Sequence, residues 1–146
     1  MLSNTCKYGI RATIYLALHA GTEKKIGIKI ISKELGIPTP FLGKILQQLA
    51  RQKILSSIKG PNGGFGLGRP ADEISMLDIV LSIDGSDLFD MCLVDLKTCA
   101  DRKQGNIPCT LHKAFSPIRK QIYEMFQNLT IDQLADELRQ DNKLRI

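Results

Sequence analysis

The three residues Gly36-Ile37-Pro38 lie between two amphipathic helix patterns, and this junction narrows the fold more than any other part of the sequence. The pattern before it covers about residues 29–35 and ends at the glycine, a residue typical of helix C-caps. The pattern after it starts at Thr39, whose hydroxyl can cap free amides, and Pro40, which has no amide to leave unpaired. Two helices across so short a bend predict a helix-turn-helix motif.

The second of these helices, expected over about residues 39–52, has one apolar and one polar face. The apolar stripe consists of Phe41, Leu42, Ile45, Leu46 and Leu49. The opposite face contains no acid and consists of Gly43, Lys44, Gln47, Gln48 and Arg51. In the major groove, glutamine amides match adenine edges, and lysine matches guanine or a phosphate. We therefore expect a recognition helix, and the alternative is an ordinary solvated face.

A glycine-rich turn follows this motif. Residues 55–59 and 65–68 have the character of short strands, and Gly60-Pro61-Asn62-Gly63-Gly64 between them predicts a hairpin. A hairpin in this position is a wing, whose glycines allow close approach to a sugar-phosphate backbone. Lys59 and Arg69 flank it and would add positive charge. A nucleotide-hydrolysing P-loop is disfavoured, because its Gly-Lys-Ser/Thr ending and its following helix are missing.

Two more helices are expected around the winged motif. The first covers about residues 4–20 and ends at Gly21. The second begins at a capping-box pair, Ser75 and Asp78, and runs to about residue 83. Residues 86–108 then show little periodicity, and a segment of this length in a compact domain is usually functional or disordered.

The C-terminal part contains a heptad-like apolar seam. Its residues are spaced alternately by four and three positions: Leu111, Phe115, Ile118, Ile122, Met125 and Leu129. The core of one chain can absorb such a seam, but pairing with a second copy uses it better. Two copies related by a two-fold axis would place their recognition helices about 34 Å apart, one turn of duplex. A last helix, about residues 131–139, follows the capping-box pair Thr130 and Gln133.

Positive charge is concentrated in the N-terminal half. Residues 1–70 contain 11 Lys and Arg against two acids, a formal charge of +9, whereas residues 71–146 contain 9 against 13, a charge of −4. This segregation predicts a polyanion-binding half, and the alternative is a chance clustering of solvated charges. No run of about 18 apolar residues is present, so we expect a soluble cytoplasmic protein that does not enter a membrane.

Three of the four cysteines lie close together in the sequence. Cys92, Cys99 and Cys109 precede His112, and thiolates with an imidazole form a donor set for iron or zinc. The close cysteine pair usual in structural zinc sites is missing. On these residues alone, a metal or cluster site and a set of inert thiols both stay open. Cys6, on the first helix, is expected in the core.

Three segments resemble the Rrf-two family of bacterial winged-helix regulators, also called BadM or IscR-type. They are residues 7–12 (KYGIRA), 36–55 (GIPTPFLGKILQQLARQKIL) and 56–80 (SSIKGPNGGFGLGRPADEISMLDIV), and the resemblance covers nearly the whole chain. It implies a homodimer that binds a palindromic operator in double-stranded DNA, with the recognition helix in the major groove and the wing in the minor groove. The DNA-binding residues are then expected to be Thr39, Pro40, Phe41, Gly43, Lys44, Gln47, Gln48, Arg51, Lys59, Gly60, Pro61, Asn62, Gly63 and Gly64.

The resemblance also implies a cofactor. In the iron-sulfur members of the family, three cysteines and a histidine three residues after the last one bind a [2Fe-2S] cluster, and Cys109-Thr110-Leu111-His112 reproduces that ending. The implied ligands are Cys92, Cys99, Cys109 and His112. The cysteine gaps of six and nine residues are longer than in the better known members.

These observations predict a mainly α-helical protein with a small β-hairpin wing. Its expected parts are a winged helix-turn-helix domain (1–84), a cysteine-containing sensor loop (85–112), and a dimerisation helix with a C-terminal helix (113–146). The expected function is sequence-specific transcription regulation tuned by the cluster. The alternatives are a cluster-free regulator and a scaffold controlled by a metabolic enzyme. An enzyme is disfavoured, because no nucleophile–base pair or carboxylate constellation is found.

Overall fold

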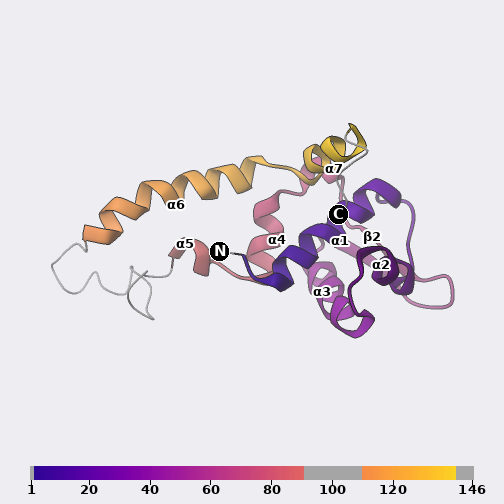
Figure 1. The fold of residues 1–146 in the computed structure, drawn as a ribbon. Helices are drawn as coiled ribbons and strands as arrows, with labels where there is room; N and C mark the ends of the chain where they lie inside the picture. Colours follow the sequence, from indigo (N-terminus) through magenta and orange to yellow (C-terminus); the bar gives the residue numbers. More distant parts are fainter. Residues whose placement is uncertain (1, 91–109, 141–146) are drawn as a thin grey trace.

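The computed structural model describes residues 2–90 and 110–140, and it shows a helical body from which one long helix extends (Figure 1). The elements are α1 (Asn4–His19), α2 (Ile28–Leu35), α3 (Thr39–Arg51), β1 (Leu55–Ile58), β2 (Gly64–Leu67), the 3₁₀ turn η1 (Ala71–Glu73), α4 (Met76–Ile83), α5 (Asp87–Asp90), α6 (Thr110–Asn128) and α7 (Ile131–Gln140). The two strands pair antiparallel. The expected fold class, mainly helical with a β-hairpin wing, is confirmed.

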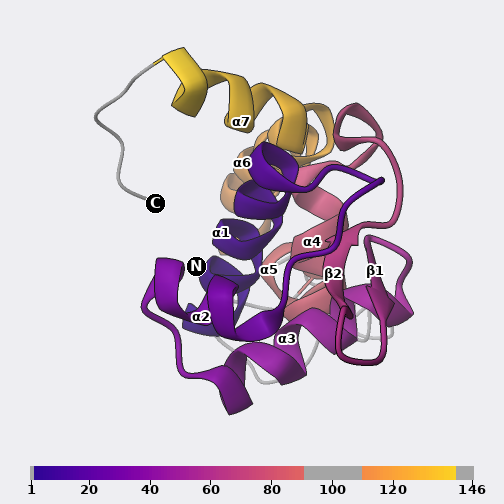
Figure 2. The same ribbon diagram turned by 90° about the vertical axis from the view of Figure 1, so that its right-hand side faces the viewer.

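Helix α1 lies at the centre of the body, between α7 and the pair α2 and α3 (Figure 2). It begins after Ser3, whose hydroxyl accepts a hydrogen bond from the Cys6 amide at 3.0 Å. It ends before Gly21, which adopts φ +60° and so confirms the predicted stop. Gly9 faces α4 so closely that a Cβ atom on it would lie 2.3 Å from Cδ1 of Ile83.

The helix-turn-helix motif is present, but its turn is closed differently from the prediction. Helix α2 ends at Gly36 with φ +64°, as expected. The N-cap of α3 is Pro38, so the prediction that Thr39 caps this helix is wrong. The hydroxyl of Thr39 instead donates to Oγ of Ser32 at 3.0 Å, and that serine donates to the carbonyl of Ile37. Helix α3 therefore begins one residue earlier than predicted, and the Thr39 side chain connects the turn to α2 instead of capping α3.

The wing is attached to the segment that precedes α2. Ile26 and Phe65 exchange two backbone hydrogen bonds of 2.9 Å, which adds a third short segment to the two-stranded hairpin. Gly64 sits where this segment crosses, and a Cβ atom there would lie 2.3 Å from the carbonyl oxygen of Ile26. The close backbone approach explains why glycine occupies this position.

Helix α4 begins with the predicted capping box. The hydroxyl of Ser75 accepts a hydrogen bond from the Asp78 amide (3.1 Å), and the Asp78 carboxylate accepts one from the Ser75 amide (2.9 Å). The same carboxylate pairs with the Arg69 guanidinium at 2.7 Å. Arg69 was expected to direct its charge at a nucleic acid, and this expectation is wrong because its guanidinium is bound to α4.

The long helix α6 joins the body at its C-terminal end. The Met76 amide donates to the Leu129 carbonyl and the Ile131 amide donates to the Ile74 carbonyl, both at 2.8 Å, so that a short β-bridge connects the α6–α7 junction to the start of α4. The predicted capping box of Thr130 and Gln133 is present at the start of α7. Helix α5 forms one turn in a stretch predicted to lack periodic structure.

Helix α7 belongs to the same core as the winged motif. It packs against α1 and η1, and its residues Ile131 and Ala135 are fully buried. The C-terminal part expected from residue 113 onward therefore shares its core with the winged motif through α7. None of the helices in 2–90 and 110–140 is both long and apolar enough to cross a membrane.

Asp78→Ala should lower the free energy of unfolding by about 1–2 kcal/mol, because it removes a helix cap and the partner of Arg69 together. Asp72→Ala, on the neighbouring exposed turn, is the matched control and should change stability by less than about 0.5 kcal/mol. Urea unfolding followed by circular dichroism measures both variants. Equal stability of the two would contradict this account of the cap.

Candidate nucleic-acid interface

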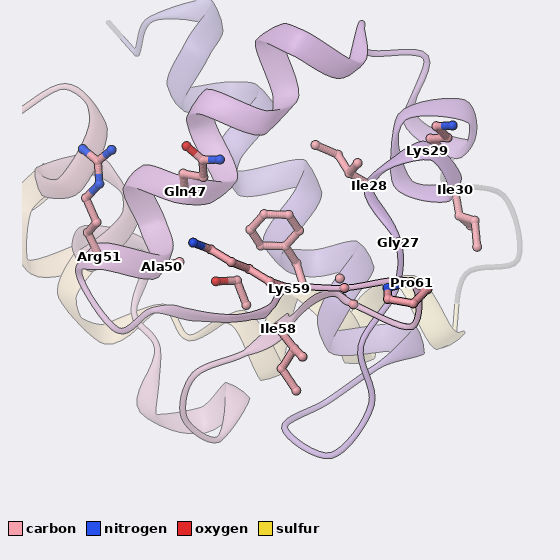
Figure 3. A pocket seen from close by; sticks show the side chains of 15 residues that line it. Gly27, Ile28, Lys29, Ile30, Gln47, Ala50, Arg51, Ile58, Lys59 and Pro61 are labelled. Atoms are coloured by element: carbon pink, nitrogen blue, oxygen red, sulfur yellow. The ribbon is translucent and has the colours of Figure 1, made fainter.

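A groove of about 930 Å³ lies between the N-terminus of α2, the exposed side of α3 and the wing (Figure 3). Lys29 of α2, Arg51 of α3 and Lys59 of the wing line it, and all three are exposed. Among the described residues that line it there is no carboxylate. Three elements thus direct cations toward one concave surface, an arrangement that attracts a polyanion.

The exposed side of α3 forms a polar row. Lys44, Gln47 and Arg51 are exposed and spaced by three and four positions, so they share one side of the helix. The side chains of Leu42, Ile45, Leu46 and Leu49 are buried, as the apolar stripe predicted. The row therefore presents hydrogen-bond donors and positive charge on a helix held by its opposite side.

Two predicted members of these faces lie elsewhere. The Gln48 amide donates to the carbonyl of Ser82 on α4 at 2.6 Å, so the expectation that it shares the exposed face is wrong. Phe41, which was expected both on the apolar stripe and among the DNA-binding residues, is 39% exposed and contacts the ring of Tyr8 edge-on, with centroids 5.7 Å apart. Both residues lie at the boundary between the apolar and polar faces of α3. Their contacts with α4 and α1 determine where their side chains point.

Most of the remaining predicted DNA-binding residues lie in the wing turn. Lys59, Gly60, Pro61 and Asn62 are exposed, and the Gly63 amide donates to the Gly60 carbonyl at 2.9 Å. Gly60 has φ +110°, a conformation that favours glycine. Pro40 is exposed at the start of α3, whereas the Thr39 hydroxyl is bound to Ser32.

The N-terminus of α2 is part of the groove, and the sequence analysis missed it. Its N-cap is Gly27, which supplies no side chain to cap the first-turn amides. Gly27, Ile28, Lys29 and Ile30 all line the groove. Helix N-termini with free amides bind phosphate groups. The signal available in the sequence was a glycine directly before an amphipathic helix.

The predicted cluster ligands are described only in part. Cys92, Cys99 and Cys109 lie outside the described residues, whereas His112 is exposed on the first turn of α6. Within 2–90 and 110–140 no three His, Cys, Asp or Glu side chains are grouped to hold a metal ion. Cys6 is buried in the core, as predicted. Burial, assisted by the charge of Asp84 and a hydrogen bond to it, raises the pKa of the Cys6 thiol to about 12.

Helix α6 leaves much of its apolar seam exposed. Leu111, Ile118 and Met125 are 43%, 47% and 53% exposed, and Phe115 and Ile122 are half-buried. The residue of α6 that is buried is Phe126, which is not part of the seam, and Ile122 of the seam packs partly against the core. About half of the predicted seam, Leu111, Ile118 and Met125, is thus an exposed apolar surface.

Comparisons with known proteins agree with this geometry. The family model Rrf2, described as an iron-dependent transcriptional regulator, matches residues 2–137. The HTH-type transcriptional regulator IscR of Sodalis glossinidius (strain morsitans) is 28% identical over 153 residues, covering 99% of this chain and 88% of the relative. Among solved structures, IscR of T. potens superposes with a TM-score of 0.75 at 22% identity, covering 100% of this chain and 93% of the other. CymR, the global cysteine regulator of B. subtilis, has a TM-score of 0.74 at 23% identity, with 94% and 97% covered.

Proposed function

Because the chain belongs to the Rrf2 family of transcriptional regulators, we propose that it binds a palindromic operator in double-stranded DNA as a homodimer and responds to an iron-sulfur cluster. The family consists of regulators, so the expectation that the chain is not an enzyme is confirmed. The observation that carries the proposal is the cationic groove between α2, α3 and the wing.

Each part of the groove has a role in DNA binding. The row of Lys44, Gln47 and Arg51 enters the major groove, where Gln47 reads a base edge. Lys59 follows the adjacent backbone or narrow minor groove. Lys29 and the amides after Gly27 hold a phosphate on the other side of α3. Phosphate contacts position the protein, and base contacts select the sequence.

The dimer is supported by the exposed side of α6. Three large apolar side chains of the seam, on Leu111, Ile118 and Met125, are around half exposed. A second copy of the same helix covers such a seam by coiled-coil-like packing. A two-fold axis there presents two copies of α3 to two half-sites, which a palindrome requires.

The cluster is supported by its donor set and by the family. Cys92, Cys99, Cys109 and His112 combine three soft thiolates with an imidazole, donors that suit iron. When bound, a cluster at these residues supplies a group whose presence depends on iron and redox state. In the sequence, the three cysteines lie between α5 and α6 and His112 lies in the first turn of α6, all within the 85–112 segment that we propose as the sensor. A coupling of about 1–3 kcal/mol between this segment and DNA corresponds to a 5- to 150-fold change in affinity.

A second candidate is a cluster-free regulator. The fold is shared with CymR, a global cysteine regulator, as well as with IscR, so the fold alone is compatible with more than one signal. In this case the thiols of Cys92, Cys99 and Cys109 carry no cluster, and a metabolic enzyme or another partner supplies the signal.

Lys59→Ala should weaken binding to operator and random duplex by a similar factor and lower the slope of log affinity against log salt by about 1. Gln47→Ala should instead relax the preference at one base position per half-site. Lys120→Ala on α6 is the matched charge control and should change neither quantity. Fluorescence anisotropy at several salt concentrations provides the readout. A uniform loss for both groove variants would contradict the division of roles.

Met125→Glu should convert the dimer to a monomer, because it places a charge in the seam. We expect at least a tenfold loss of affinity for a palindromic duplex, since one half-site contact no longer assists the other. Gln127→Glu introduces the same charge on the opposite side of α6, where the residue is exposed, and should leave the dimer intact. Analytical ultracentrifugation measures the oligomeric state. A dimeric Met125→Glu protein would refute pairing through α6.

Protein purified without oxygen should show visible absorption with stoichiometric iron and sulfide. Cys109→Ala should abolish both, and His112→Ala should shift the spectrum or weaken retention, because each removes one donor. Cys6→Ala is the control and should retain the spectrum, since that thiol is buried in the core. Colourless wild-type protein that binds its operator with full affinity would instead support the cluster-free candidate.

A further inference from the structure

A residue without a side chain lies beside the polar row of α3. Gly43 is half-exposed, precedes Lys44, and lies one turn before Gln47 on the same side of the helix. The surface at this point is therefore made by whatever lies beside the glycine.

The neighbour that fills this position is Ile28, the first residue of α2. Its Cδ1 atom lies 3.2 Å from the place that a Cβ atom on Gly43 would occupy. Figure 3 shows the Ile28 side chain directed from α2 toward α3 and Gln47, along the groove. Ile28 is half-exposed, so its outer methyl group is part of the groove surface as well as of the packing between the two helices.

The result is an apolar spot beside the polar side chain of Gln47, in the surface that we assign to the major groove. An unmodified base pair offers one apolar group there, the C5 methyl of thymine, and bases without it present hydrogen-bonding groups that an isoleucine methyl cannot satisfy. The missing Cβ at position 43 leaves room for the Ile28 side chain, which a larger residue there would displace from the groove surface.

We propose that Ile28, from the helix before the recognition helix, determines specificity by contacting the C5 methyl of one thymine in each half-site. The proposal rests on the DNA-binding function above. Lys44 and Gln47 keep their polar contacts, and Gly43 contributes by leaving room for the Ile28 side chain.

The test uses the full-length dimer and a duplex chosen by selection from a random library. Each thymine in the selected site is replaced in turn by deoxyuridine, which removes the methyl and leaves the hydrogen-bonding edge unchanged. Wild-type protein should lose affinity about fourfold per half-site at one thymine position, the effect expected for one buried methyl group. Ile28→Ala should bind the thymine and deoxyuridine duplexes within twofold of each other.

Two further variants make the result specific. Ile28→Val removes only the Cδ1 methyl that lies beside Gly43, so it keeps most of the packing and should still reduce the thymine preference to below twofold. Leu81→Ala removes an exposed apolar side chain from α4, which does not line the groove, and should retain the fourfold preference.

The negative results of this experiment distinguish a failure of this inference from a failure of the proposed function. Wild-type protein that binds its selected duplex without any dependence on thymine methyl groups overturns this inference and leaves the proposed function standing. A preference that persists unchanged in folded Ile28→Val protein overturns it as well. Wild-type protein that binds no duplex at low salt overturns both.

Discussion

The burial of α1 is the constraint on which the rest of the structure depends. Seven of its 16 residues are buried, and small ones among them, Gly9 and Ala12, let the neighbouring helices approach closely. Thr13, a buried polar residue of this helix, donates its hydroxyl to the Gly9 carbonyl at 2.8 Å, so its own donor is paired. Each of α2, α3, α4 and α7 packs against this helix. Packing against α1 therefore fixes both the direction in which the polar row of α3 faces and the position of α7 in the body.

Around this support, the chain separates its two surfaces. The cationic groove lies on the side of α2, α3 and the wing, and the apolar seam lies on α6 (Figures 1 and 3). The first turn of α4 connects them, because Asp78 binds Arg69 behind the wing and Ser75 pairs with Thr130 at the end of α6. These two contacts form a short connection between α6 and the base of the wing.

The parts predicted well from sequence are those that local chemistry decides. Gly36 and the capping box of Ser75 with Asp78 set helix ends through residues a few positions away, and the structure has both. The predictions that failed depend on distant partners: Gln48 is bound to Ser82, and Arg69 to Asp78. Ile28 was missed for the same reason, since its place beside Gly43 exists only after two helices pack. For the candidate cluster site, the sequence remains the basis for Cys92, Cys99 and Cys109, which lie outside the described residues.

The junction of α6 with the body is made by main-chain groups: the amides of Met76 and Ile131 and the carbonyls of Leu129 and Ile74. Side-chain substitutions leave these main-chain hydrogen bonds in place. Residues on the outer side of α6 can therefore change while the helix stays attached to the body. Under the proposed pairing through α6, a copy of this chain altered along the seam would therefore change its choice of partner helix while the cationic groove stayed intact.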